Sequence, residues 1–164
     1  LIPFLPRVGS NSREPANGFD IHPDGKTLLI PFDQNARVPV AACYNRDQKT
    51  LDTLALPIDS VVGRTCLWMR YNSTGSKILY SYYPYSAFGD AVWTSSEVGI
   101  IDAVTRQKKV IPIQINRDNI SVNVFPSWSP NDKDIIFGSA PVTKASGNVV
   151  GLYSIAIKKN VLGL

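Results

Sequence analysis

The sequence predicts an all-β protein built from three similar units, and two observations support this. Its short apolar runs of four to seven residues alternate with clusters of Gly, Pro, Asn, Asp and Ser, as in chains of strands joined by turns. One ten-residue pattern also occurs three times, at residues 21–30, 71–80 and 128–137. Internal repeats of this kind are typical of folds that place one supersecondary unit beside the next.

Each copy of the pattern predicts a tight hairpin. It consists of an apolar residue, a polar turn and three consecutive apolar residues. The same turn position is occupied by Gly25, Gly75 and Asp132, at separations of 50 and 57 residues. Gly and Asp tolerate the backbone angles that tight hairpins require. The strand after each turn begins with three apolar residues in a row, which predicts that both of its faces are covered.

Two further strands are expected in each unit. The third strands are predicted at residues 38–44, 98–102 and 149–157. Polar turns are predicted to follow them, at residues 45–49, 105–108 and 158–160. The fourth strands are predicted to begin at Thr50, Lys109 and Val161. Four antiparallel strands in a unit of about 50 residues make the blade of a β-propeller.

The chain is therefore expected to be a segment of about three four-stranded antiparallel propeller blades. Residues 1–16 are predicted to form the outer strand of a preceding blade and its connection. The three blades are predicted at residues 17–60, 61–119 and 120–164, the last with an incomplete outer strand. Propellers close with about four to eight blades, so these blades are expected to belong to a larger ring or to an assembly of two copies.

The repeat resembles that of a known group of propellers. The segment Trp128-Ser-Pro-Asn-Asp-Lys-Asp-Ile-Ile-Phe137 and the turn His22-Pro-Asp-Gly-Lys26 are similar to the repeat of TolB-like and WD-repeat-like β-propellers, whereas Asn72-Ser-Thr-Gly75 is a degenerate copy. The resemblance covers the whole chain and implies the fold. It implies no single function, because such repeats occur in periplasmic, secreted, peptidase-associated and virus-encoded proteins. It favours a location outside the cytoplasm or in a virion.

Side chains suited to catalysis or metal binding are few. The single histidine, His22, precedes Pro23 in the first turn, where a turn-capping role is favoured over a catalytic one. No Gly-x-Ser-x-Gly or Cys-x-x-Cys motif occurs. Cys43 and Cys66 are interpreted as buried free thiols, although they could pair in an oxidising compartment. We therefore expect a protein that is not an enzyme, with no cofactor and no bound metal.

The charge and hydropathy of the chain argue against two classes of partner. The formal net charge is +4 at pH 7, and most basic residues are scattered along the chain. A nucleic-acid surface requires such residues to be clustered, so no nucleic-acid partner is expected. No apolar run approaches the roughly 18–20 residues that span a bilayer, so membrane insertion is not expected either.

The stretch from Tyr80 to Trp93 is the strongest candidate for a binding surface. It is predicted to be a long connection between the second and third strands of the middle unit, where aromatic rings offer a large contact area at low entropic cost. The candidate contact residues are five aromatic residues of this stretch and three arginines expected on the same face: Tyr82, Tyr83, Tyr85, Phe88, Trp93, Arg37, Arg64 and Arg117. Alternatively, Tyr80 and Tyr82 complete a strand and the other rings cover the edge of the blade.

Three functions are compatible with these observations. The first is a non-catalytic binding or structural module that contacts a protein partner, or a glycan, within a larger envelope, secreted or virion assembly. The second is an accessory propeller domain of a prolyl oligopeptidase-like hydrolase, whose chemistry lies in a separate domain. The third is a self-assembling structural protein whose partners are copies of itself.

Overall fold

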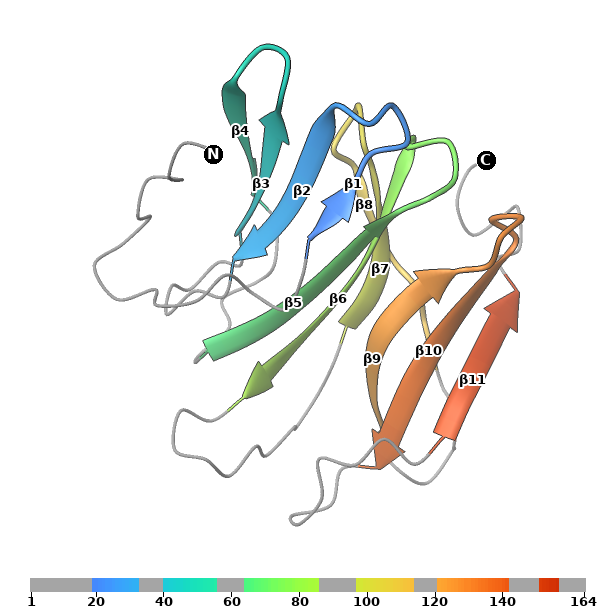
Figure 1. Cartoon of the computed structure of the whole chain (residues 1–164). Helices are drawn as coiled ribbons and strands as arrows, with labels where there is room; N and C mark the ends of the chain where they lie inside the picture. Colours follow the sequence, from blue (N-terminus) through green and yellow to red (C-terminus); the bar gives the residue numbers. More distant parts are fainter. Residues whose placement is uncertain are drawn as a thin grey trace.

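The computed structural model describes residues 19–32, 40–55, 64–85, 97–113, 121–141 and 151–156, and all regular structure within these ranges is β-strand. The strands form three antiparallel sheets, which we call A, B and C and which follow one another in chain order (Figure 1). This part of the chain contains no helix long and apolar enough to cross a membrane. The predicted blade boundaries at 16/17, 60/61 and 119/120 fall outside the described residues and stay predictions.

Sheet A contains four strands in the order β1-β2-β3-β4. These are β1 (Asp20–Ile21), β2 (Thr27–Phe32), β3 (Val40–Asn45) and β4 (Thr50–Ala55). Each strand pairs with the next in antiparallel register, which places Leu29 between Asp20 and Cys43. The fourth strand begins at the predicted residue.

Sheet B has the same order of strands, β5-β6-β7-β8. These are β5 (Arg64–Tyr71), β6 (Lys77–Tyr85), β7 (Glu97–Asp102) and β8 (Lys108–Val110). Both β7 and β8 begin one residue before the predicted positions.

Sheet C contains three described strands in the order β11-β10-β9, which are β9 (Ser121–Trp128), β10 (Asp134–Pro141) and β11 (Gly151–Ala156). The fourth strand predicted from Val161 lies outside the described residues. The pairing of β9 with β10 passes from Ser127–Ile136 to Val124–Gly138, so two residues of β9 stand opposite one of β10. This β-bulge bends the strand locally.

The first strands of the three sheets lie next to one another. Strand β5 contacts both β1 and β9, and β9 also contacts β6 and β7. Figure 1 shows the three sheets fanning out from these first strands. This is the radial arrangement of propeller blades, in which the first strand of each blade is innermost and the fourth is outermost.

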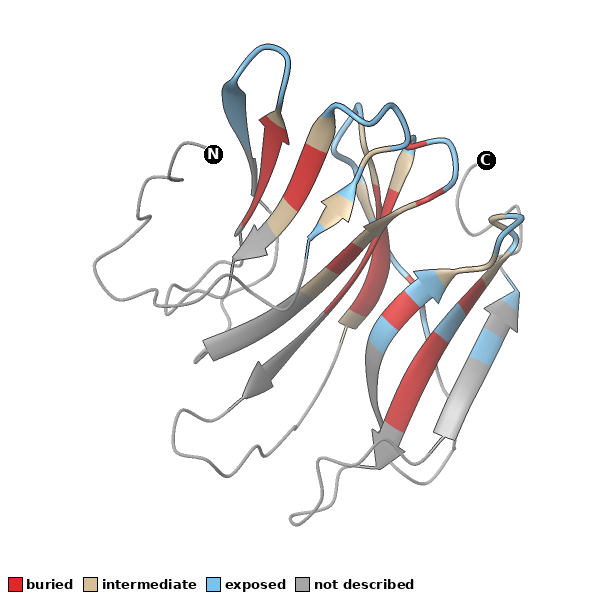
Figure 2. Cartoon of the chain, in the orientation of Figure 1, coloured by how far each residue is buried: buried red, intermediate tan, exposed pale blue. Residues whose placement is uncertain are grey.

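Two apolar cores lie between the sheets and account for their stacking. The core between sheets A and B contains Leu29, Ala41, Cys43, Met69, Ile78, Tyr80 and Ile101. The core between sheets B and C contains Leu79, Val98, Ile100, Ile111, Ile135 and Phe137. Alternate residues of β6 and β7 therefore enter opposite cores, and Figure 2 shows both strands buried at their centres. The prediction that a uniformly apolar strand is covered on both faces is confirmed for β6.

The three hairpin turns between the first and second strands share one backbone design. In each turn the first residue donates its N–H to the carbonyl of the sixth, over 2.9 Å in the turn of His22, 3.0 Å in that of Asn72 and 2.9 Å in that of Ser129. The fourth residues are Gly25, Gly75 and Asp132, with φ of 72°, 75° and 57°. These three residues were predicted to occupy the special turn position, and the left-handed φ values confirm it.

The turns between the third and fourth strands share a second design. The side chain of Asn45 accepts hydrogen bonds from the N–H groups two and three residues later, and that of Asp102 does the same. The residues four positions after them, Lys49 and Arg106, have φ of 54° and 63°. The predicted turn at 105–108 was therefore placed too late, because it is Asp102, the last residue of β7, that caps the turn.

An aromatic ring packs against a glycine in the middle of a strand. Gly99 of β7 lies opposite Tyr80 of β6 in the register. A Cβ atom at Gly99 would lie 2.4–2.7 Å from the hydroxyl and ring atoms of Tyr80. The Tyr80 hydroxyl donates to Glu97 Oε1 over 2.5 Å, and Lys108 Nζ donates to the same oxygen over 3.0 Å. The absent side chain at Gly99 thus provides the space that the buried ring occupies.

Candidate binding surface

The structure places four of the eight predicted contact residues on strands. Tyr82, Tyr83 and Tyr85 belong to β6, and Arg64 is the first residue of β5. The expectation that the connection begins near Tyr80 is wrong, because β6 continues to Tyr85, and the alternative that Tyr80 and Tyr82 belong to the strand is confirmed. The strand extends this far because β5 is long enough to provide a register partner for each of these residues. The remaining predicted contact residues lie outside the described ranges: Arg37, Phe88, Trp93 and Arg117.

The register brings one predicted arginine beside the tyrosine run. Arg64 lies opposite Tyr85, and Cys66 and Leu67 lie opposite Tyr83 and Tyr82. These residues therefore share one end of sheet B, away from the turn at Asn72. Their use as a contact surface stays a prediction.

A second aromatic and arginine group lies on the first strands, and we call it the inner-strand cluster. It consists of Trp68 and Arg70 of β5 and Phe125 of β9. The Arg70 guanidinium carbon lies 4.4 Å from the centre of the Trp68 ring, which is a cation–π contact. The Phe125 ring lies edge-on to the same indole, with centroids 5.3 Å apart and an interplanar angle of 77°.

Hydrogen bonds hold Arg70 between neighbouring sheets. Its Nη1 donates to the carbonyl of Phe19 over 3.0 Å and to that of Met69 over 3.2 Å. The indole Nε1 of Trp128 donates to the carbonyl of Arg70 over 3.2 Å. The position of the cluster is therefore fixed by contacts with both sheet A and sheet C.

Phe125 has an unusual backbone conformation for an aromatic residue. It lies in the β-bulge of β9 with φ of 52°, and its side chain is 42% exposed. A large residue in the left-handed region costs about 1–2 kcal/mol relative to the right-handed region. Strained positions of this kind concentrate at functional sites, so Phe125 marks the inner-strand cluster as a candidate site.

The sequence analysis missed this cluster. Trp68 and Arg70 are two residues apart on β5, a spacing that puts both side chains on the same side of a strand. That spacing was a usable signal. The contribution of Phe125 could not be found in the same way, because the bulge that presents its ring is not visible in the apolar pattern of residues 121–128.

The hairpin turns of neighbouring sheets also contact each other, at the fourth turn position. The imidazole of His22 lies against Gly75, where a Cβ atom would overlap its Nε2, and its ring is edge-on to Tyr71 at 4.9 Å. His22 Nδ1 also accepts the N–H of Asp24 over 3.2 Å, which confirms its predicted turn-capping role. This contact joins sheet A to sheet B.

The next boundary uses the same position with different chemistry. The carboxylate of Asp132 accepts the N–H of Ser73 over 3.1 Å, its hydroxyl over 2.5 Å and the side-chain amide of Asn72 over 3.3 Å. All of these donors belong to the turn of sheet B. At the fourth turn position, therefore, sheet C contacts sheet B through hydrogen bonds, whereas sheet A contacts sheet B through the packing of the His22 ring.

The one cysteine whose side chain is described is buried. Cys43 is 8% exposed and has a free thiol. Burial raises the pKa of the Tyr71 hydroxyl well above its ordinary value, and the neighbouring Cys43 thiol raises it further. Cys66 lies on β5, but its side chain is not among those described. Within the described ranges, no group of three His, Cys, Asp or Glu side chains is arranged to hold a metal ion.

Similarity to one solved structure agrees with the architecture. A scan against protein-family models found no match, and a search of curated proteins found none. Among solved structures, TolB from Acinetobacter baumannii superposes with a TM-score of 0.55 at 18% identity, over 82% of this chain and 28% of that one. The β-propeller domain of the Trilobed protease from Pyrococcus furiosus gives a TM-score of 0.46 at 11% identity, over 75% of this chain and 33% of that domain.

The first of these similarities covers most of the described strands. At 28% of the length of TolB, the chain corresponds to part of such a propeller. The three fanned sheets, their order and the repeated turns agree with this similarity. The chain therefore has a β-propeller fold, similar to that of TolB.

Proposed function

We propose that this chain is a non-catalytic propeller module that binds a protein partner through the inner-strand cluster. The observation that carries the proposal is the exposed Phe125 ring, held at a strained backbone position against the Trp68–Arg70 pair. Tryptophan and arginine are the residue types that contribute most often to the binding energy of protein interfaces. A pre-positioned group of this kind loses little conformational entropy when a partner binds.

The module would act outside the cytoplasm and would catalyse no reaction itself. Its partner would be part of a larger assembly outside the cytoplasm, consistent with the kind of repeat from which the fold is built. A glycan would be a weaker fit, because Arg70 Nη1 already donates hydrogen bonds to two backbone carbonyls and is not free to bind sugar hydroxyls.

The test is a substitution that removes the ring without unfolding the sheet. Phe125→Gly relieves a left-handed strain of about 1–2 kcal/mol, which offsets part of the loss of the aromatic contact and of the partly buried ring, so we expect only a moderate fall in the melting temperature. Affinity capture from extracts of the native source, followed by measurement of the dissociation constant, should show at least about tenfold weaker partner binding.

The matched control is Val104→Ala. Val104 is 84% exposed and lies in the turn before β8, away from the first strands. This variant should bind like the wild type. The proposal is wrong if Phe125→Gly retains the same partner with unchanged affinity, or if both variants lose it equally.

The predicted aromatic residues of β6 and the following segment need a separate test. Combined replacement of Tyr83, Tyr85 and Phe88 by alanine should reduce partner binding further if they extend the same surface. An unchanged dissociation constant would limit the binding surface to the inner-strand cluster.

A further inference from the structure

Sheet B carries a hollow that the proposed protein-binding role does not use. Its volume is about 390 Å³, which lies within the range of small-ligand sites. The lining residues come from the start of β6, from β7 and from the turn and strand that follow it: Lys77, Ile100, Asp102, Thr105, Gln107, Lys108 and Lys109. The register puts Lys77, Asp102 and Lys109 on the same face of sheet B, whereas the side chain of Lys108 points to the opposite face. Two lysines and one aspartate therefore give this lining an excess of positive charge.

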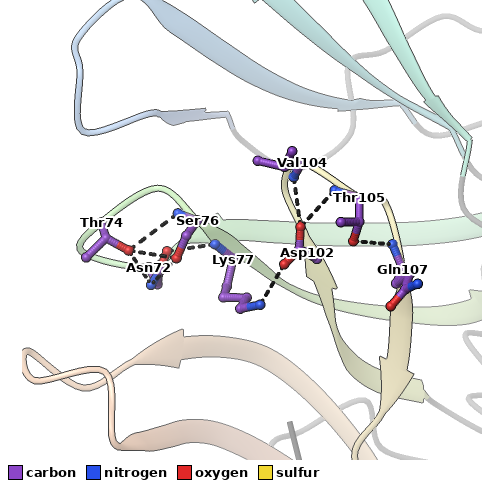
Figure 3. A network of polar contacts seen from close by, with 8 residues as sticks. All are labelled: Asn72, Thr74, Ser76, Lys77, Asp102, Val104, Thr105 and Gln107. Atoms are coloured by element: carbon purple, nitrogen blue, oxygen red, sulfur yellow. Dashed lines mark hydrogen bonds and ion pairs between the residues drawn. The ribbon is translucent and has the colours of Figure 1, made fainter. Parts of the chain in front are cut away.

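The single carboxylate of the lining is already compensated by its neighbours (Figure 3). One oxygen of Asp102 accepts Lys77 Nζ over 2.7 Å, and the other accepts the N–H groups of Val104 and Thr105 over 3.0 and 2.8 Å. Lys77 and these backbone groups hold the pKa of Asp102 far below its ordinary range. Asp102 therefore stays ionised and orders the turn, and it has little capacity left to neutralise Lys109.

The lysines keep unused hydrogen-bond donors. An ammonium group has three N–H bonds. Lys77 donates one N–H to Asp102 and keeps the others, whereas the Lys108 ammonium bonds to Glu97 on the other face of sheet B and adds no donor to the hollow. Lys109 is exposed and makes no ion pair among the described residues. The side-chain amide of Gln107 adds a further polar group to the lining.

We propose that this hollow binds a phosphate group. A tetrahedral phosphate offers several acceptor oxygens and a charge near −2, which matches a lining with two ammonium groups and few free acceptors of its own. A carboxylate has two oxygens and one charge, so it satisfies fewer of these donors. Lys109 is the residue whose charge the bound group would compensate, while Lys77 would donate a second hydrogen bond.

The experiment is a titration of the full chain with inorganic phosphate, followed by NMR at constant ionic strength. We expect saturable shifts concentrated at the backbone amides of residues 102–109, with a dissociation constant on the order of 1 mM. Lys109→Gln should weaken binding by about tenfold. Lys109→Gln is expected to fold normally, because its side chain is exposed and makes no ion pair among the described residues.

The control variant is Lys133→Gln, which removes an exposed lysine from the first turn of sheet C. It should bind phosphate like the wild type. Equal weakening by both variants would show only general attraction to a chain of net charge +4 and would overturn the proposal. The absence of saturable shifts would also overturn it. Acetate should bind more weakly than phosphate, and equal or tighter acetate binding would rule out the preference for phosphate.

Discussion

At the two boundaries between neighbouring sheets, equivalent hairpin turns contact each other through different side chains. Between sheets A and B, the imidazole of His22 packs on Gly75. Between sheets B and C, the carboxylate of Asp132 accepts hydrogen bonds from Ser73 and Asn72. Gly75 and Asp132 are the fourth residues of equivalent turns, and both have positive φ. The backbone conformation of this turn position is thus the same in both copies, whereas the side chains that make the contact differ.

The fourth residue of the first turn, Gly25, has the positive φ without the contact between sheets. Gly25 has φ of 72°, but a Cβ atom there would meet nothing within 4 Å. At Gly25, therefore, glycine is required only by the positive φ. At Gly75 it is required both by the positive φ and by the His22 ring, which leaves no space for a side chain. Comparing the same substitution at both glycines measures the packing contribution of His22.

The largest effect is expected from Gly75→Ala. The methyl group must adopt a left-handed conformation, at about 1–2 kcal/mol, and must displace the His22 ring, at about 1–3 kcal/mol. We expect a loss of about 3 kcal/mol in the free energy of unfolding, measured by urea denaturation. Gly25→Ala should lose only about 1 kcal/mol.

A double variant identifies the cause of this difference. In His22→Ala/Gly75→Ala the methyl group has space, so the combined loss should be smaller than the sum of the two single losses by about 1 kcal/mol or more. Equal losses for Gly75→Ala and Gly25→Ala would contradict the packing role of His22.

A smaller effect is expected from Asp132→Asn. Asparagine tolerates a positive φ nearly as well as aspartate, so the turn should be kept while the charge-assisted bonds to Ser73 are weakened. We expect a loss of about 1 kcal/mol in the free energy of unfolding. In a Ser73→Ala background the same substitution should cost less, and an unchanged cost would show that the hydroxyl contact does not stabilise the boundary.

A loss of stability at neutral pH together with a distinct pH dependence is expected from Asp102→Asn, because the variant lacks at neutral pH the stability that the wild type loses in acid. Asp102 occupies the capping position that Asn45 occupies in sheet A, so an amide can form the same turn. Because hydrogen bonds from Lys77 and the backbone lower the pKa of Asp102 below its ordinary value of 3.8, its stabilising contribution is present above that value and is lost as pH falls. The variant should lose less stability than the wild type when thermal unfolding is followed from pH 5 down to about pH 2.

The control for this prediction is Asp52→Asn. It removes the same charge from β4 and leaves the Lys77–Asp102 pair intact. The contribution of Asp102 to acid sensitivity should persist in this variant. An unaltered pH profile for Asp102→Asn would show that the ion pair adds nothing to folding.

The sequence was informative about local structure because single residues determine it. Gly25, Gly75 and Asp132 stand at turn positions that few other residues tolerate, so the hairpins and their equivalence could be predicted. The apolar run of β6 likewise predicted burial on both faces. The equivalent positions Leu29 and Leu79 are 0% exposed, whereas Ile136 is 37% exposed, which the apolar pattern alone does not distinguish.

The candidate site was harder to predict because it depends on contacts between strands. The stretch from Tyr80 was predicted to be a connection because of its length, but pairing with β5 extends β6 to Tyr85. The inner-strand cluster unites residues 68, 70 and 125, which only the succession of first strands brings together. The bulge also gives Phe125 a left-handed backbone conformation, which no local sequence motif predicts.

The ring of Tyr80 above Gly99 has a consequence for how this chain can change over time. Neither residue can be replaced alone, since a side chain at 99 meets the ring and a smaller residue at 80 leaves a void in the core. Among related sequences, the two positions should therefore vary together, with small residues at 80 wherever position 99 carries a side chain. Because the Tyr80 hydroxyl also bonds to Glu97, the identity of residue 97 should follow the same pair.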